Sequence, residues 1–168
     1  MTLNWIIPQR TYELPPSNIA LLDTNVLVAI SKEDDSLHAQ ALARLDEAEF
    51  AWVVPHISYI EAWNFLVGRE KSRRSADRLF AWVSTPGNTY QIGEALEPFD
   101  QPNLIAQKFA LDLVDVSLAD LATRMKRECG LHSTVAVATY DTGDFLRLFK
   151  RENMDFRVFD MRDGEIIE

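Results

Sequence analysis

Short apolar segments that alternate with helical patterns restrict the fold of this chain more than any other feature. Each segment is of strand length, and they span residues 19–22, 50–54, 135–139 and 156–159. Strands that are apolar on both faces are typical of parallel sheets covered by helices on each side. Helices are expected at 26–31, 37–49, 58–67, 76–84, 104–113, 118–129 and 143–153. This order predicts an α/β protein with three layers, α/β/α, around a central and mainly parallel sheet of four to five strands.

The remaining segments complete one domain. Pro86-Gly87-Asn88 predicts a turn, 89–92 an additional short or edge strand, and 93–102 a loop. We find no internal repeat or change in composition that marks a second domain. We therefore expect an N-terminal extension at 1–18, packed on the surface through Trp5 and Ile7, and a single domain at 19–168.

Charge and cysteine content exclude several classes of protein. The net charge of −9 argues against a protein that coats nucleic acid with a uniformly positive surface. An acidic site that binds divalent cations remains compatible with nucleic-acid chemistry, because the cations reverse the local charge.

A single cysteine excludes an intrachain disulfide. No apolar run approaches a membrane span and no secretion signal is evident, so we expect a cytoplasmic protein without membrane contact.

Two carboxylates follow predicted strands directly. Asp23 comes after the strand at 19–22, and Asp141 follows the strand at 135–139 after one residue. In an open parallel sheet, ligands bind beyond the carboxyl ends of the strands, so these two side chains are candidates for one site. Each also has a structural alternative, because Asp23 and Asp141 are good N-caps for the helices that follow them.

Two further acids are candidates from helical segments. Glu61 lies in a helix that is apolar on nearly all sides, where an unpaired carboxylate is costly, and Asn64 one turn later is a candidate support. A structural salt bridge is the alternative. Asp120 lies three residues after Ser117, which matches a capping box. Asp115 is close enough to be mistaken for the third acid, but the Ser-Leu-Ala-Asp pattern favours Asp120.

These motifs together resemble one known family. Leu-Asp-Thr-Asn-Val-Leu at 22–27, the isolated Glu61, Ser-Leu-Ala-Asp at 117–120 and Thr-Tyr-Asp-Thr-Gly-Asp-Phe at 139–145 are similar, in this order, to the PIN-domain ribonucleases. More narrowly, they resemble the VapC-like branch, the toxins of bacterial toxin–antitoxin pairs. The resemblance runs from about 19 to 160, nearly the whole chain.

The resemblance implies a set of functional residues. The four catalytic acids, which would also bind Mg²⁺ or Mn²⁺, would be Asp23, Glu61, Asp120 and Asp141, with Asp144 as a further metal ligand. Supporting polar residues would be Thr24, Asn25 and Thr139. Such hard oxygen ligands suit Mg²⁺ and Mn²⁺, and the cation would offset the repulsion between clustered carboxylates.

The implied activity is metal-dependent hydrolysis of RNA phosphodiester bonds by an endoribonuclease that leaves a 5′-phosphate and a 3′-hydroxyl. The protein would be the toxin of a type II toxin–antitoxin system, with an antitoxin as partner. Two alternatives stay within the resemblance, namely a PIN-like RNA-processing nuclease outside such systems and a non-catalytic PIN-like RNA-binding or scaffold module. A haloacid-dehalogenase-type phosphatase is disfavoured, because Asn25 stands where that motif needs a second Asp.

Basic and apolar segments suggest where partners would bind. A basic cluster follows the Glu61 helix and consists of Arg69, Lys71, Arg73, Arg74 and Arg78. It is either a phosphate-binding edge for RNA or a solvated connection between helices. The resembled family commonly forms homodimers, and the apolar helices between Ile57 and Val83 are the expected interface.

Overall fold

A seven-stranded sheet forms the centre of the chain. The computed structural model describes residues 4–6, 18–85, 90–93, 100–129, 133–152 and 154–167. Within these ranges the strands are β1 Asn4–Ile6, β2 Asn18–Leu22, β3 Ala51–Pro55, β4 Tyr90–Gly93, β5 Thr134–Thr139, β6 Arg157–Asp160 and β7 Glu165–Ile167. Their order in the sheet is β1-β4-β3-β2-β5-β6-β7. The five inner strands are parallel, and the edge strands β1 and β7 are antiparallel to their neighbours.

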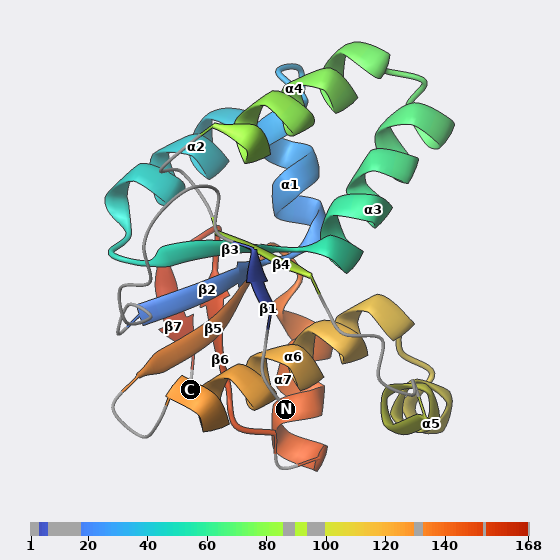
Figure 1. Cartoon of the computed structure of the whole chain (residues 1–168), viewed down its shortest axis with the longest axis vertical. Helices are drawn as coiled ribbons and strands as arrows, with labels where there is room; N and C mark the ends of the chain where they lie inside the picture. Colours follow the sequence, from blue (N-terminus) through green and yellow to red (C-terminus); the bar gives the residue numbers. More distant parts are fainter. Residues whose placement is uncertain are drawn as a thin grey trace.

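Helices cover both faces of this sheet (Figure 1). The elements on one side are α1 Thr24–Ser31, α2 His38–Glu47, α3 His56–Asn64, the π-helix η1 Phe65–Arg69 and α4 Arg73–Ser84. The elements on the other side are α5 Asp100–Phe109, α6 Leu113–Cys129 and α7 Thr142–Glu152. The predicted three-layer α/β/α architecture and the parallel sheet are therefore confirmed, and the two antiparallel edge strands add to it.

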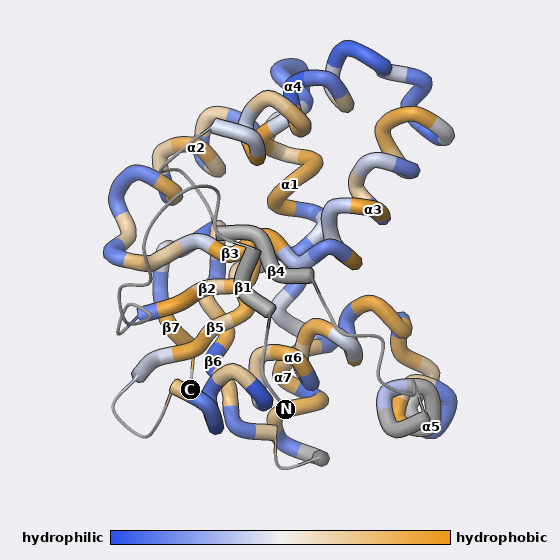
Figure 2. The backbone as a smooth tube through the Cα atoms, in the orientation of Figure 1, coloured by the Kyte–Doolittle hydropathy of each residue, from blue (hydrophilic) through white to orange (hydrophobic). Residues whose placement is uncertain are grey.

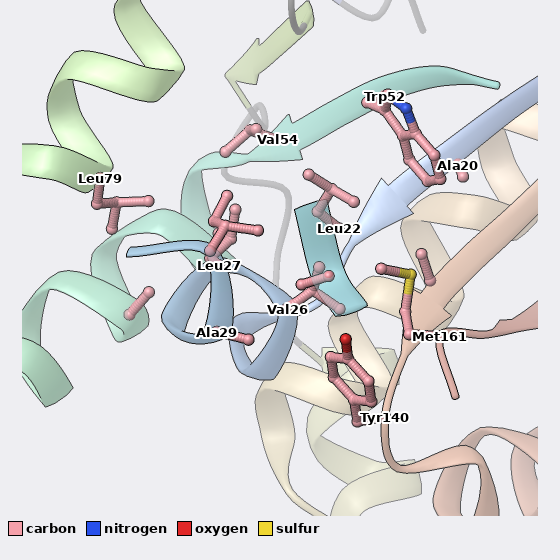
Figure 3. Packing of buried hydrophobic residues seen from close by; sticks show 14 of the residues in the cluster. Ala20, Leu22, Val26, Leu27, Ala29, Trp52, Val54, Leu79, Tyr140 and Met161 are labelled. Carbon is pink, nitrogen blue, oxygen red and sulfur yellow. The ribbon is translucent and has the colours of Figure 1, made fainter. Parts of the chain in front are cut away.

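The alternation of side chains along β2 explains the two cores. Ile19 and Leu21 point into the cluster with α6 and α7, whereas Ala20 and Leu22 point into the cluster with α1 to α4. All four residues are fully buried. Figure 3 shows the second cluster, where Leu22 packs near Val26 and Leu27 of α1. In Figure 2 the central strands carry hydrophobic colouring over part of their length, and the helices show hydrophobic and hydrophilic colouring in turn along the chain.

Several predicted boundaries shift. β1 extends the sheet beside β4, with Trp5 opposite Ile92, while the rest of the expected extension up to 17 lies outside the described residues. The turn at 86–88 also lies outside them. The expected loop at 93–102 is shorter than predicted, because α5 begins at Asp100.

The start of α6 is the most consequential shift. The helix begins at Leu113, five residues before the predicted start at 118. Asp112 precedes the helix, and its carboxylate accepts a hydrogen bond from the backbone N–H of Val114 at 2.7 Å. Ser117 lies inside the helix, and its hydroxyl donates to the carbonyl of Leu113 at 2.7 Å. The predicted capping box at Ser117 is therefore wrong.

The helix that carries Glu61 is less buried than its composition suggested. Ile60 on α3 is 57% exposed and Val67 on η1 is 42% exposed. The opposite side of α3 packs through Ser58 and Ala62, which are fully buried. Only one face of this helix therefore lies in the core. None of the helices within the described ranges is long and apolar enough to span a membrane.

Candidate active site at the carboxyl ends of the strands

Asp23 lies at the carboxyl end of the central strand β2. It is the N-cap of α1 and is only 4% exposed. The backbone N–H of Thr24 donates to its Oδ1 at 2.6 Å, and the hydroxyl of Thr139 donates to its Oδ2 at 2.7 Å. Each carboxylate oxygen thus accepts one hydrogen bond and retains a lone pair for a further partner.

Thr139 and Asn25 join this strand end to its neighbour β5. The amide Nδ2 of Asn25 donates to Thr139 Oγ1 at 2.9 Å, and Asn25 Oδ1 accepts from the backbone N–H of Tyr140 at 3.1 Å. The backbone N–H of Asp141 also donates to Thr139 Oγ1, at 2.9 Å. The predicted supporting residues Asn25 and Thr139 therefore do contact Asp23, directly or through one hydrogen bond.

Thr24 connects Asp23 to Glu61. Its hydroxyl donates to Glu61 Oε2 while its backbone N–H donates to Asp23. Glu61 comes from α3 and is half-buried. Asn64, which was expected to support Glu61, is exposed, and the structure describes no hydrogen bond between the two. Thr24 occupies the supporting role instead.

Asp141 and Asp144 come from the segment between β5 and α7. Asp141 is exposed and accepts a hydrogen bond from the backbone N–H of Gly143 at 3.3 Å. Asp144 lies in the first turn of α7 and pairs with Arg147 at 3.1 Å. β5 is the parallel neighbour of β2, so this loop and Asp23 lie at the same end of the sheet. The charge of Asp141 also acts to raise the pKa of Asp23.

Asp115 is the acid that α6 directs toward this group. It lies in the first turn of α6, and its carboxyl interacts electrostatically with Asp23, Asp144 and Glu61. Burial, followed by the nearby charges of Asp23, Asp112, Asp144 and Glu61, raises the pKa of Asp115 to about 7. Asp115 therefore lies near acids from three other parts of the site, the end of β2, α3 and the start of α7.

Asp120, the predicted third acid, points elsewhere. Its Oδ2 pairs with Arg124 Nε at 2.9 Å, one turn along the same helix. Five residues rotate an α-helix by about 140°, so Asp120 and Asp115 lie on different faces. Asp120 is half-buried, with exposed Leu113 and Arg127 seven residues to either side and buried Val116, Ser117 and Thr123 closer to it. The assignment of Asp120 as the third acid stays a prediction. The sequence did contain a signal for Asp115, because Asp112 precedes it by three residues just as Ser117 precedes Asp120.

Burial controls the protonation of Asp23. Desolvation raises its pKa to about 6, although the hydrogen bonds from Thr139 and Thr24 lower it. The charges of Glu61 and Asp141 also act to raise the pKa. A buried carboxylate with acidic neighbours is stabilised as an anion by a bound cation.

The oxygen donors fit a hard divalent cation. Within the described ranges, no three acidic, histidine or cysteine side chains stand close enough to form a ready-made metal-binding group. Mg²⁺ does not require one, because it keeps several water ligands and binds through one or two carboxylates plus substrate phosphate. The carboxylates of Asp23, Glu61, Asp115, Asp141 and Asp144 are the residues that would hold it.

The predicted basic cluster divides into two groups. Arg69, Lys71, Arg73 and Arg74 are exposed, and the guanidinium of Arg69 lies 5.6 Å from the ring centroid of Phe65. Arg78 instead pairs with Glu33 at 2.6 Å. Glu61 and Arg69 are eight residues apart, which corresponds to about 12 Å along a helix. The exposed cations thus begin about two helical turns beyond the acidic group.

An apolar hollow lies between α3 and α4. It has a volume of about 290 Å³ and is lined by Val54, His56, Tyr59, Ile60, Phe80, Val83 and Ser84. Ile60 and Phe80 at its rim are 57% and 58% exposed. Ile60, Trp63 and Val67 follow the spacing of one helix face, so an uncharged stripe along α3 and η1 meets the hollow at Ile60. We call the residues that line the hollow, together with Trp63 and Val67, the α3–α4 apolar face.

Comparison with known proteins decides the family. A PIN-domain family model matches residues 20–150, which is most of the chain. The chain belongs to the PIN-domain family. The match spans β2 to α7 and includes every acid described above. No curated protein matches the sequence.

Three solved structures share this PIN fold. VapC20 from Mycobacterium tuberculosis, a sarcin-ricin loop cleaving toxin, has a TM-score of 0.60 and 17% identity over 76% of this chain and 93% of its own. VapBC2 from Rickettsia felis, bound to a promoter DNA fragment, has a TM-score of 0.58 and 15% identity over 84% and 99%. FitAcB from Neisseria gonorrhoeae has a TM-score of 0.56 and 18% identity over 86% and 99%. At these identities the likeness concerns the fold.

Proposed function

We propose that this PIN domain is an endoribonuclease that depends on Mg²⁺ or Mn²⁺ and hydrolyses RNA phosphodiester bonds. The observation that carries the proposal is the convergence of five acids from four segments of the chain beyond the carboxyl ends of parallel strands, with buried Asp23 at the centre. PIN-family membership supports the nuclease assignment. The sequence resemblance supports RNA as the substrate, with a 5′-phosphate and a 3′-hydroxyl as products.

The chain's own residues divide the work as follows. Asp23, Asp115 and Asp141 would hold the cation, with Glu61 and Asp144 as further ligands. Asp115 replaces Asp120 in this set, because Asp120 is paired with Arg124 on another face of α6. A bound divalent cation would supply an acidified water for attack on phosphorus and positive charge for the phosphate oxygens. Thr24, Asn25 and Thr139 orient the carboxylates that face the substrate.

RNA would approach along the exposed cations that follow α3. Arg69, Lys71, Arg73 and Arg74 form a short basic edge in a chain of net charge −9. Phosphates bind such cations through release of counterions. Arg78 would contribute less than the others, because Glu33 already neutralises it.

Structural neighbours support a role as the toxin of a type II toxin–antitoxin system. VapC20 is a toxin, and VapBC2 and FitAcB are toxin–antitoxin complexes, which supports an antitoxin as partner here. We also propose a homodimer that forms through the α3–α4 apolar face. Two copies of this chain repel each other through their negative net charge, and an uncharged face is where they can meet with the least repulsion. A neighbouring reading frame that encodes a small DNA-binding protein would support the toxin assignment.

One alternative keeps the nuclease but not the toxin role, as an RNA-processing enzyme. A non-catalytic scaffold is the other, and the five acids around the strand ends speak against it.

Cleavage of RNA by the purified chain tests the proposal. Wild type with Mg²⁺ or Mn²⁺ should cleave a structured RNA, whereas Asp23→Asn or added chelator should abolish cleavage. A far-UV circular dichroism spectrum shows whether the variant remains folded. Equal cleavage by wild type and Asp23→Asn would rule out this site.

A further inference from the structure

Arg147 is a cation at the edge of the acidic group. Its Nη1 lies 3.1 Å from Asp144 Oδ1, one turn back along α7. Side chains of a helix lean toward its N-terminus, so the guanidinium of Arg147 reaches back toward the strand ends from which α7 starts. The charge of Asp144 in turn acts on Asp115. Asp144 therefore links the guanidinium of Arg147 to the acids of the site.

Arg147 differs from the other arginines that pair with acids in the described part of the chain. Its side chain is 60% exposed, whereas those of Arg44, Arg78 and Arg124 are each 27% exposed. A guanidinium has five N–H donors, and the described residues provide a partner for Nη1 alone. The remaining donors of Arg147 are therefore open to a ligand that arrives from solvent.

We propose that Arg147 binds a phosphate of the RNA on the α7 side of the acids. A guanidinium presents its donors as a planar fork, which matches the oxygens of a phosphate. Asp144 keeps this fork beside the acids. RNA then crosses the acids from the α3–α4 turn in one helical layer to the start of α7 in the other (Figure 1). This inference rests on the proposed function, because it adds a substrate contact to the same site.

A simpler role for the pair of Asp144 and Arg147 is to stabilise α7, as many pairs at this spacing do. In that case Arg147→Gln and Asp144→Asn both lower the melting temperature slightly and leave RNA binding unchanged. A phosphate contact predicts opposite signs for the two substitutions. Arg147→Gln weakens RNA binding, whereas Asp144→Asn strengthens it, because the carboxylate no longer competes with phosphate for the guanidinium.

Fluorescence anisotropy with a single-stranded RNA, in the Asp23→Asn background that prevents cleavage, measures these effects. Arg147→Gln should raise the dissociation constant by at least about fivefold and reduce the slope of log K against log salt by about 0.7, the value for one phosphate contact. Arg147→Lys keeps the charge but loses the fork, so its dissociation constant should lie between those of Arg147→Gln and the background chain. Thermal melting shows that each variant is folded.

Lys150 provides a matched control on the same helix. It is exposed and lies six residues beyond Asp144, which corresponds to about 9 Å along α7. Lys150→Gln removes the same charge as Arg147→Gln and should change the dissociation constant by less than about twofold, because a charge at this distance is largely screened by salt. Equal losses for Arg147→Gln and Lys150→Gln would overturn the inference.

A double variant separates a phosphate contact from an effect of net charge. Arg147→Gln combined with Asp144→Asn has the same net charge as the background chain, so charge alone predicts that RNA binding returns to the background value. We expect the double variant to bind about as weakly as Arg147→Gln, because Asp144→Asn acts through a guanidinium that is absent. Full recovery of RNA binding would contradict the proposed contact.

The inference and the proposed function fail in different ways. Wild type that cleaves RNA, while Arg147→Gln binds RNA with unchanged affinity, would overturn the inference alone. Wild type that does not cleave RNA with Mg²⁺ or Mn²⁺ would overturn the proposed function, and the inference with it.

Discussion

Asp115 and Asp120 illustrate how strongly the role of a carboxylate depends on its face of the helix. Asp115 lies among the charges of Asp23, Glu61 and Asp144, and burial is the main cause that raises its pKa to about 7. Asp120 has an arginine one turn away as its partner. A partly exposed pair of this kind contributes at most about 1 kcal/mol to stability. An aspartate on this helix therefore lies among other acids in one position and beside an arginine in the other.

This difference predicts opposite results for two matched substitutions. Asp115→Asn should lower the rate of RNA cleavage by about 100-fold or more, equal to about 3 kcal/mol of transition-state stabilisation. Asp120→Asn should cleave within about threefold of wild type. Single-turnover cleavage of one RNA by both variants is the measurement. A large loss in Asp120→Asn with none in Asp115→Asn would restore the assignment made from the sequence.

The pKa of Asp23 predicts how the metal-free protein responds to pH. Its ordinary value is 3.8 and the folded value is about 6, so the folded state holds this proton more tightly than the unfolded state. The contribution of this group to the free energy of unfolding is therefore greatest below about pH 4. It falls by about 3 kcal/mol as the pH rises through about 6. Other carboxylates also make the free energy of unfolding depend on pH. Their effect is common to wild type and Asp23→Asn and cancels when the two proteins are compared.

Urea unfolding in chelator at about pH 4.5, 6 and 7.5 measures this effect across the raised pKa. The free energy of unfolding of wild type, relative to Asp23→Asn, should fall across that range. Added Mn²⁺ should restore part of it at the highest pH, because binding to the folded state alone stabilises it. Identical pH dependence in both proteins would contradict the raised pKa.

At the scale of elements, the strands were predictable and the helix starts were not. The runs at 19–22 and 135–139 are apolar at nearly every position, so both faces of each strand must be buried. β2 and β5 therefore lie where expected. The start of α6 had two good caps, Asp112 and Ser117, within five residues. A start after Ser117 puts Asp120 in the first turn of the helix, whereas the observed start at Leu113 puts Asp115 there. The edge strand β7 is short and half exposed, which leaves little apolar signal.

The exposure of α3 was also beyond sequence reasoning. A helix apolar on both sides is buried either by its own domain or by a partner, and composition does not distinguish the two. The fold buries Ser58 and Ala62 but leaves Ile60 outside. Glu61 was correctly expected to need a partner, and Thr24 rather than Asn64 provides it.

If a second copy covers this face, Ile60→Glu should weaken the homodimer. Two buried charges at a symmetric interface lack partners, so the dissociation constant should rise by at least about tenfold. Leu42→Glu on α2, which is 37% exposed, is a control of equal chemistry away from the face. Size-exclusion chromatography with light scattering gives the mass of each protein. Wild type that is monomeric at all concentrations, or a dimer that survives Ile60→Glu, would contradict the proposed interface.

At the scale of the whole molecule, the distribution of charge matters more than its sum. The net charge of −9 repels RNA at long range, and the acids at the strand ends are part of that charge. The exposed cations of η1 and α4 and of the turn between them offset it near the end of the Glu61 helix. RNA is therefore expected to approach over the α3–α4 turn, and salt should weaken its binding by screening these few contacts.

Neutralising two of these cations should change the salt dependence more than a general loss of charge does. Arg73→Gln with Arg74→Gln, in an Asp23→Asn background that prevents cleavage, should raise the dissociation constant for single-stranded RNA. It should also reduce the slope of log K against log salt by about 1.4, since each of the two phosphate contacts contributes about 0.7. Arg127→Gln with Lys150→Gln removes the same charge from exposed positions on α6 and α7, in the other helical layer. Fluorescence anisotropy at several salt concentrations separates the pairs. Equal slopes would mean that RNA follows another path to the acids, whereas a smaller slope for the first pair alone would place its phosphates on the α3–α4 turn.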